Sequence, residues 1–167
     1  MRRLTTIKGA RAGRNQAGFS LIELLVVVAV ILIIAAIAIP NYIQSKMRAN
    51  EASAVQNLRN ISTAEIMYSS TYGINYSVTL LQLSGNGINP DQNNAGTIDD
   101  VLAGGVKSGY RFVYTPVLTD ANGHTVTYTL TADPLSATTG QRHFYTDQTC
   151  VIRTNNSVQA GPTDLPI

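Results

Sequence analysis

At 167 residues, the chain is long enough for one domain of ordinary size plus a membrane segment, but too short for two domains. Its charge is distributed unevenly: residues 1–18 carry five Arg and Lys and no acid, so their removal changes the net charge from +2 to −3. Seven scattered Lys and Arg follow, which argues against direct nucleic-acid binding, because phosphates are neutralised by a clustered basic surface. Cys150 is the only cysteine, so an intramolecular disulfide is excluded.

A long apolar run follows the basic segment. Residues 21–39 read LIELLVVVAVILIIAAIAI, in which Glu23 is the single polar residue. A helix of this length is about enough to cross a bilayer core of roughly 30 Å. The preceding Arg and Lys favour a cytoplasmic N terminus, which places everything after Ile39 on the opposite side of the membrane. We therefore expect a single-pass membrane protein whose C-terminal part faces outward.

Two ordinary interpretations of this run leave Glu23 unexplained. A secretory signal would be cleaved after Ala36, Ile37 and Ala38, but its apolar core would be longer than the roughly 7–15 residues typical of such signals. An uncleaved membrane anchor fits the length of the run. Neither interpretation accounts for a carboxylate near the start of the apolar segment.

A carboxylate inside hydrocarbon costs at least a few kcal/mol, so Glu23 is a candidate functional residue that needs a positive partner. If the chain is cut between Gly18 and Phe19, a new α-amino group appears one helical turn before Glu23. The two opposite charges can then compensate each other, within one chain or between staggered chains. Pairing between chains would set the axial register of neighbouring helices.

The residues around this position, GFSLIEL over 18–24, together with Pro40 after the apolar run, resemble the type IV prepilin signature. The resemblance implies cleavage after Gly18 by an inner-membrane prepilin peptidase, N-methylation of Phe19 and retention of the apolar helix in the mature subunit. It also implies that the helix anchors the precursor in the inner membrane until the pilus assembly machinery moves it into the core of a helical homopolymer. Glu23 would pair there with the Phe19 amine of a neighbouring subunit.

Beyond the apolar run, we expect a globular head over residues 40–167 that begins with an amphipathic helix. Pro40 should kink or loosen the helix because it lacks a backbone N–H. The helix should continue to about residue 72 and end at Gly73. Apolar residues at helical spacing mark its buried stripe: Ile43, Met47, Ala54, Leu58, Ile61 and Tyr68. Residues expected to face solvent or neighbouring subunits are Lys46, Arg48, Glu51, Gln56 and Arg59.

Residues 73–109 are rich in Gly, Asn and Ser and are predicted to form mainly a loop. Two short ordered pieces should interrupt it, one around residues 80–83 and one that starts at Asp99 and Asp100 and stops at Gly104. We interpret the acidic pair as a helix start rather than a calcium site, because Ca²⁺ needs six or more oxygen ligands and no fixed ligand spacing is present. No metal and no cofactor are predicted.

Strand patterns dominate from residue 110 onward. Apolar and polar residues alternate over 110–115 and 126–130, with turn residues at 120–123 between them, and the segments HFYT and CVIRT predict a second hairpin. An antiparallel sheet of three or four strands packed on the helix stripe gives an α+β fold. This order of long helix, loop and sheet is similar to that of type IVa-like pilins and type II secretion pseudopilins, although the C-terminal cysteine pair of many such pilins is missing.

No residue pattern supports catalysis, because His124, His143 and Cys150 form no recognisable nucleophile, metal or phosphate motif. The predicted function is that of a structural subunit that polymerises into a type IV pilus for adhesion, motility or DNA uptake. The precursor would lie in the inner membrane and the assembled filament outside the cell. A type II secretion pseudopilin is the alternative, since it shares the same N-terminal chemistry. A membrane-anchored binding module that never polymerises is a third hypothesis, in which Glu23 has no role.

Overall fold

The computed structural model describes residues 18–85 and 89–167, so the predicted leader lies outside the described residues apart from Gly18. The chain divides into two compact units at the junction between Ile39 and Pro40. Helix α1 (Leu21–Tyr72) contributes residues to both units and contains Pro40. The second unit holds all the other helices and strands that the structure describes.

The C-terminal end of α1 is set by a glycine. Tyr72 is the last helical residue, and Gly73 has a φ of 65° while its N–H donates to the Ser69 carbonyl oxygen at 3.1 Å. A left-handed residue after the last turn satisfies a carbonyl that the helix leaves open, and glycine adopts this conformation without Cβ strain. The prediction that Gly73 ends the helix is confirmed.

Within the described part of the chain, six strands form one antiparallel sheet in the order β1-β2-β3-β4-β5-β6. Their bounds are β1 (Val106–Lys107), β2 (Tyr110–Thr119), β3 (Thr125–Pro134), β4 (His143–Asp147), β5 (Arg153–Asn155) and β6 (Leu165–Pro166). The α+β fold is confirmed, but the predicted count of three or four strands is wrong. The two edge strands have two residues each, which is too short to display alternation in the sequence.

The turn between β2 and β3 forms where the sequence predicts it. Asp120 Oδ1 accepts hydrogen bonds from the N–H groups of Asn122 and His124, at 2.9 and 2.8 Å. Gly123 has a φ of 84°, a conformation that glycine adopts readily. The two strands then pair with Phe112 opposite Ala132, so their alternating residues share one face.

The hairpin of β4 and β5 differs from the prediction in its second strand. We expected a strand over CVIRT, but β5 begins only at Arg153, which pairs with Tyr145. Cys150 has a φ of 59°, and its N–H donates to the Asp147 carbonyl oxygen at 2.9 Å, so it belongs to the turn. Cys150 is exposed.

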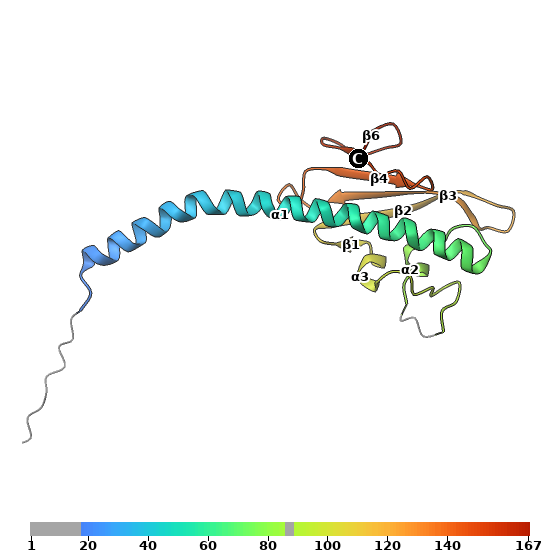
Figure 1. Cartoon of the computed structure of the whole chain (residues 1–167), viewed down its shortest axis with the longest axis horizontal. Coiled ribbons are helices and arrows are strands. Elements are labelled where there is room, and N and C mark those ends of the chain that lie inside the picture. The colour runs from blue at the N-terminus through green and yellow to red at the C-terminus, as the bar shows by residue number, and fades with distance from the viewer. Residues whose placement is uncertain (1–17, 86–88) are drawn as a thin grey trace, which may run out of the picture. The chain divides into compact units, whose positions relative to one another are not determined.

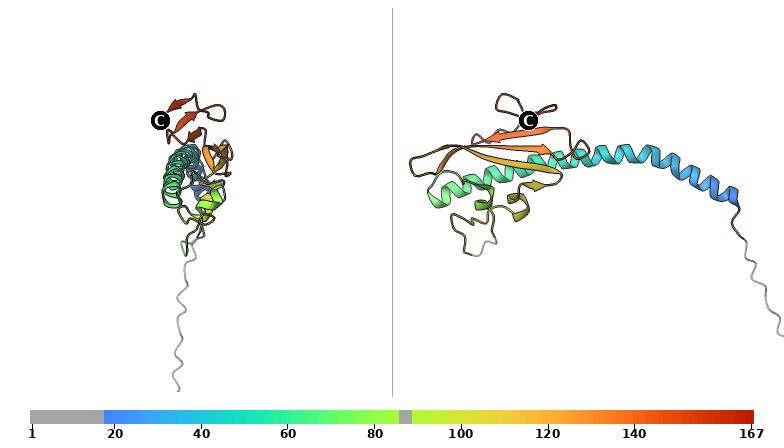
Figure 2. Two further views of the ribbon diagram at one scale, coloured as in Figure 1. Left: turned by 90° about the vertical axis from the view of Figure 1, so that its right-hand side faces the viewer. Right: turned by 180° about the vertical axis from the view of Figure 1, so that it is seen from behind.

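The core of the second unit lies between the second half of α1 and one face of the sheet (Figures 1 and 2). The buried apolar residues of the helix are Ala54, Leu58, Ile61, Ala64 and Tyr68. The sheet residues that belong to this core are Tyr110, Phe112, Tyr128, Leu130, Ala132 and Phe144. The predicted stripe is confirmed from Ala54 to Tyr68. Ile43 is 38% exposed, because it precedes the part of α1 that packs in this core.

Two short helices, α2 (Leu80–Leu83) and α3 (Asp100–Ala103), add Leu80, Leu83 and Leu102 to the core. Asp99 caps α3: its Oδ1 accepts the Leu102 N–H at 3.0 Å, while its Oδ2 pairs with Lys107 Nζ at 2.7 Å. Both short ordered pieces are confirmed, and so is the interpretation of the acidic pair as a helix start.

Candidate functional site

The N-terminal end of α1 carries a capping arrangement made by Ser20 and Glu23. Glu23 Oε2 accepts a hydrogen bond from the Ser20 N–H at 2.9 Å, and the Ser20 carbonyl oxygen accepts one from the Leu24 N–H at 3.2 Å. A Glu three residues after a Ser is the sequence form of a capping box, in which the carboxylate satisfies the N–H of the residue before the helix. A negative charge in the first turn also suits the positive end of the helix dipole. Glu23 therefore has a local role in the single chain.

The apolar run of α1 has almost no packing partner among residues 18–85 and 89–167. Within residues 21–39, every residue except Ala35 is exposed, and Phe19 just before the run is 90% exposed. Among the described residues, α1 is the one helix that is long and apolar enough to cross a membrane. A helix that is apolar on all sides needs lipid or other apolar helices around it.

Among the residues that the structure describes, none compensates the charge of Glu23. Glu23 forms no ion pair with any residue that the structure describes. The Phe19 nitrogen is part of a peptide bond, but cleavage before Phe19 would turn it into an ammonium group beside the turn that Glu23 caps. Gly18, Phe19 and Glu23 thus lie together at the start of α1, whereas Pro40 lies much later in the same helix.

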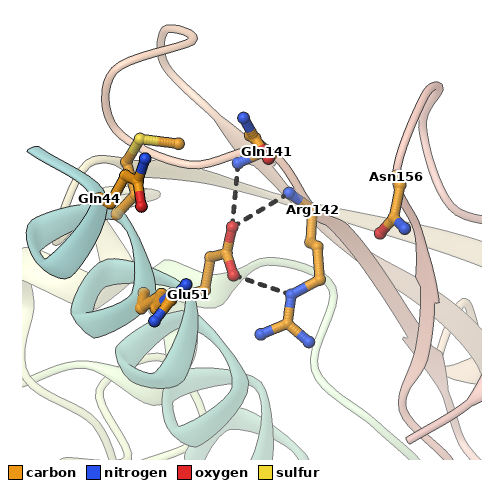
Figure 3. Close-up of a pocket in the computed structure, with 7 residues that line it drawn as sticks. Gln44, Glu51, Gln141, Arg142 and Asn156 are labelled. Atoms are coloured by element: carbon orange, nitrogen blue, oxygen red, sulfur yellow. Dashed lines mark hydrogen bonds and ion pairs between the residues drawn. The ribbon is translucent and has the colours of Figure 1, made fainter. Parts of the chain in front are cut away.

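A second polar cluster joins α1 to the segment before β4. Glu51 Oε1 accepts hydrogen bonds from the N–H groups of Gln141 and Arg142, at 3.0 and 3.3 Å, and Oε2 accepts one from Arg142 Nε at 2.8 Å (Figure 3). Burial alone would raise the pKa of the Glu51 carboxyl, but these hydrogen bonds outweigh it and hold the pKa below its ordinary value. The expectation that Glu51 faces solvent is wrong, since the residue is 7% exposed.

A cavity of about 620 Å³ opens beside this cluster. Its residues on α1 are Gln44, Met47, Arg48 and Glu51. Its residues on the facing C-terminal segments are Gln141, Arg142 and Asn156. The Arg142 guanidinium also lies 5.4 Å from the centre of the Phe144 ring, a distance at which a cation is attracted to the ring face.

Known proteins match the chain first in its N-terminal region. Residues 13–39 match the family model of the prokaryotic N-terminal methylation motif. The chain is 46% identical over 56 residues to the type IV major pilin protein PilA of Myxococcus xanthus, which covers 34% of this chain and 26% of the relative. It is 44% identical over 55 residues to the type IV wide pilus major component PilA4 of Thermus thermophilus, which covers 33% of this chain and 42% of the relative. These two matches span less than two thirds of either relative.

A fimbrial protein of Pseudomonas aeruginosa is similar over a longer stretch. It is 39% identical over 112 residues, which covers 58% of this chain and 73% of the relative. The chain belongs to the type IV pilin family. In this pilin, the matched methylation motif contains Gly18, Phe19 and Glu23 and ends immediately before Pro40.

The pilin head also holds a buried carboxyl group that the sequence reasoning missed. Glu65 on α1 is fully buried; its Oε2 accepts the Ser77 N–H at 2.9 Å and its Oε1 accepts the Ser77 hydroxyl at 2.6 Å. Burial raises the pKa of Glu65, and the hydrogen bonds from Ser77 oppose that rise only in part. The Tyr114 hydroxyl donates to the Ser77 carbonyl oxygen at 2.8 Å, so the network links α1, the loop after it and β2.

Helical spacing is the signal that could have placed both buried acids. Glu51 lies four residues after Met47 and three before Ala54, and Glu65 stands in the same relation to Ile61 and Tyr68. Both acids therefore fall on the apolar stripe of the helix.

The remaining titratable pairs of the pilin head are isolated. His143 Nδ1 lies 2.6 Å from Asp133 Oδ1, and His124 Nδ1 lies 3.1 Å from Asp120 Oδ2. Across residues 18–85 and 89–167, no group of three or more His, Cys, Asp and Glu is arranged to hold a metal ion. Pilins are structural subunits; the first pair joins β4 to β3, and the second lies at the turn between β2 and β3.

Proposed function

We propose that this pilin is a membrane-held precursor that is cut between Gly18 and Phe19, methylated at Phe19, and polymerised into a type IV pilus. The observation that carries the proposal is the start of α1, where the exposed apolar surface of residues 21–39 includes one capped carboxylate, Glu23. Membership of the type IV pilin family supports it. The names of the relatives, a type IV major pilin and a wide pilus component, favour a pilus over a secretion pseudopilus.

The proposal assigns three roles along the chain. Residues 1–18 are the cytoplasmic leader that prepilin peptidase removes, residues 19–39 span the inner membrane and later form the filament core, and residues 40–167 form the exported head. Pro40, at the start of the head, allows the helix to bend as subunits pack.

Glu23 has one oxygen available for a neighbouring subunit. Its Oε2 accepts the Ser20 N–H, whereas Oε1 has no hydrogen-bond partner in the described chain. In a filament, Oε1 accepts from the Phe19 ammonium of an adjacent subunit while Oε2 keeps capping its own helix. An uncompensated carboxylate in an apolar environment costs at least about 3 kcal/mol, so helices bundle in the axial register that supplies the ammonium.

Two substitutions separate the capping role from the charge-pairing role. Glu23→Gln keeps an oxygen that can accept the Ser20 N–H but removes the charge, whereas Glu23→Ala removes both. We expect both variants to reduce the amount of the chain in sheared surface fibres at least about tenfold, since about 1.4 kcal/mol corresponds to a factor of ten. Asp100→Asn is the matched control, because it removes an exposed carboxylate of the head.

The measurement is the amount of this chain in the sheared fibre fraction and in the membrane fraction. Wild-type fibre amounts from Glu23→Ala would contradict the proposal. Fibres from Glu23→Gln but not from Glu23→Ala would show that Glu23 acts only as a helix cap.

A further inference from the structure

The turn at the end of the β2–β3 hairpin (Figure 1) carries an asparagine that is followed by a glycine. Asn122 and Gly123 are the one Asn–Gly pair among residues 18–85 and 89–167, and both are exposed. A Cβ placed on Gly123 would have nothing within 4 Å apart from its two chain neighbours. Water therefore reaches the peptide bond between these two residues.

The stability of an asparagine side chain depends on the residue that follows it. The backbone nitrogen of the next residue, once hydroxide has taken its proton, attacks the side-chain carbon Cγ. A new C–N bond forms, the Cγ–Nδ2 bond breaks, and ammonia leaves after its nitrogen takes a proton from water. Water then opens the resulting succinimide ring at either carbonyl, which gives aspartate or isoaspartate. A Cβ on the following residue hinders the attack, and glycine has none.

Asp120 holds the turn in a form that opposes this attack. Its Oδ1 accepts the N–H groups of Asn122 and His124, at 2.9 and 2.8 Å, and its carbonyl oxygen accepts the Gly123 N–H at 3.0 Å. The attacking nitrogen is thus engaged until the turn opens. This opening can be local, because residues 121–123 are exposed and lie outside the core.

We propose that Asn122 is a site of spontaneous deamidation, and that opening of the turn held by Asp120 sets its rate. Aspartate or isoaspartate at position 122 adds a negative charge close to the Asp120 carboxylate. Isoaspartate also adds a methylene group to the backbone, which displaces the N–H groups that Asp120 Oδ1 accepts. Both products weaken the turn and change the charge of an exposed part of the head. The reaction needs only water, so the inference does not depend on the proposed function.

The test incubates the full-length chain in detergent micelles at neutral and alkaline pH and measures conversion over time by mass spectrometry of proteolytic peptides. Peptide mapping separates Asn122 from Asn86, whose Asn–Gly pair lies outside the described residues. Conversion at Asn122 should be faster than at Asn75, which is exposed but precedes a tyrosine. It should also rise with pH, because the attacking nitrogen must lose a proton.

Asp120→Ala tests the role of the turn. It removes the two hydrogen bonds to Oδ1, and we expect conversion at Asn122 to become about tenfold faster, the factor that corresponds to about 1.4 kcal/mol. Asp91→Ala is the matched control, because Asp91 Oδ1 accepts the N–H groups of Asn93 and Asn94 in a different loop. Its conversion at Asn122 should equal that of the wild type.

Hydrogen exchange of the wild-type protein tests local opening without any substitution. The Gly123 N–H should exchange faster than the N–H of Leu130, which is buried on β3 and pairs with both neighbouring strands. In Asp120→Ala, exchange of the Gly123 N–H should accelerate by the same factor as conversion at Asn122.

Four results would overturn the proposal. The first is conversion at Asn122 no faster than at Asn75, and the second is an unchanged rate in Asp120→Ala. The third is equal acceleration in Asp120→Ala and Asp91→Ala, which would assign the effect to a general loss of structure. The fourth is exchange of the Gly123 N–H as slow as that of Leu130, because the turn would then open only with the whole sheet.

Discussion

The Nε atom of Arg142 lies 2.8 Å from Oε2 of Glu51, a contact that joins residues 91 positions apart in the chain. The same segment is held from the other side, because the Tyr110 hydroxyl donates to the Arg142 carbonyl oxygen at 2.8 Å. The segment that leads into β4 is thus fixed between α1 and β2. In a chain with a single cysteine, these polar contacts link the C-terminal part of the head to the helix without a disulfide.

Removal of the Glu51 side chain should destabilise the head. Glu51→Ala deletes three hydrogen bonds, two of them from backbone N–H groups, and we expect it to lower the free energy of unfolding by about 2–3 kcal/mol. Glu51→Gln keeps an acceptor for those N–H groups and should cost about half as much. The measurement is urea unfolding of the full-length chain in detergent micelles, followed by circular dichroism. Gln56→Ala, at an exposed position of the same helix, is the control. A Glu51→Ala variant as stable as this control would contradict the account.

Gly140 should not tolerate a side chain, because it lies against the ring of Tyr110. A Cβ at Gly140 would lie 2.7 Å from Tyr110 Cζ, and Tyr110 is fully buried and cannot move aside. We expect Gly140→Ala to lower the free energy of unfolding by about 2–3 kcal/mol through overpacking. Gly161→Ala is the matched control, since nothing lies within 4 Å of its Cβ position. Equal unfolding midpoints for the two variants would show that this contact is absent.

Glu65 should make the stability of the head depend on pH in a defined direction. Burial raises the pKa of Glu65 above its ordinary value of 4.5, so the folded state binds more protons than the unfolded state in the window between the two values. Its contribution to stability therefore falls as the pH rises through that window.

Glu65→Gln removes this dependence and keeps an oxygen for the Ser77 N–H. The free-energy difference between the variant and the wild type should shift in favour of the variant as the pH rises from about 4.5 to 7. The measurement is unfolding of both proteins at a series of pH values. A difference that does not vary with pH would be inconsistent with a buried, raised-pKa carboxyl. The pH dependence from Glu51 has the opposite sign to that from Glu65. Because the pKa of Glu51 is lowered in the folded state, its contribution to the stability of the head is lost as the pH falls through that lowered value.

Cys150 adopts a left-handed conformation, with a φ of 59°, that disfavours any side chain with a Cβ. We expect Cys150→Gly to be more stable than Cys150→Ala by about 0.5–1 kcal/mol, because only glycine relieves this strain. The neighbouring Val151 has no positive φ, so there the Ala variant should be more stable than the Gly variant. Thermal unfolding of the four proteins measures both differences. The same order at both positions would refute the assignment of strain to residue 150.

The parts of the structure that depend on contiguous residues could be predicted from the sequence. Each of these features follows from one to four neighbouring residues with distinctive backbone or capping chemistry. They are the C-terminal end of α1 at Gly73, the turn at Asp120 and the start of α3 at Asp99. The buried stripe after Ala54 follows from the helical period.

The features of the structure that the sequence does not predict depend on contacts between distant residues. Glu51 is predicted to face solvent or a neighbouring subunit because it is assigned to the face away from the apolar stripe. Its partner Arg142 lies in a segment with no helical or strand pattern of its own. The extent of β5 was overestimated because nothing local marks Cys150 as left-handed. At the candidate assembly site, the motif predicts that Glu23 lies near the start of the apolar helix, but the Ser20 cap depends on a side-chain geometry that only the structure gives.

The central claim is that the chain is cut before Phe19 and keeps its apolar helix in a fibre. The most direct measurement is the intact mass and N-terminal sequence of the subunit in fibres sheared from the cell surface. The account predicts a chain that begins at Phe19 and carries one additional methyl group on its terminal nitrogen. Fibres without this chain, or a surface form that begins at Met1 or after Ala38, would contradict it.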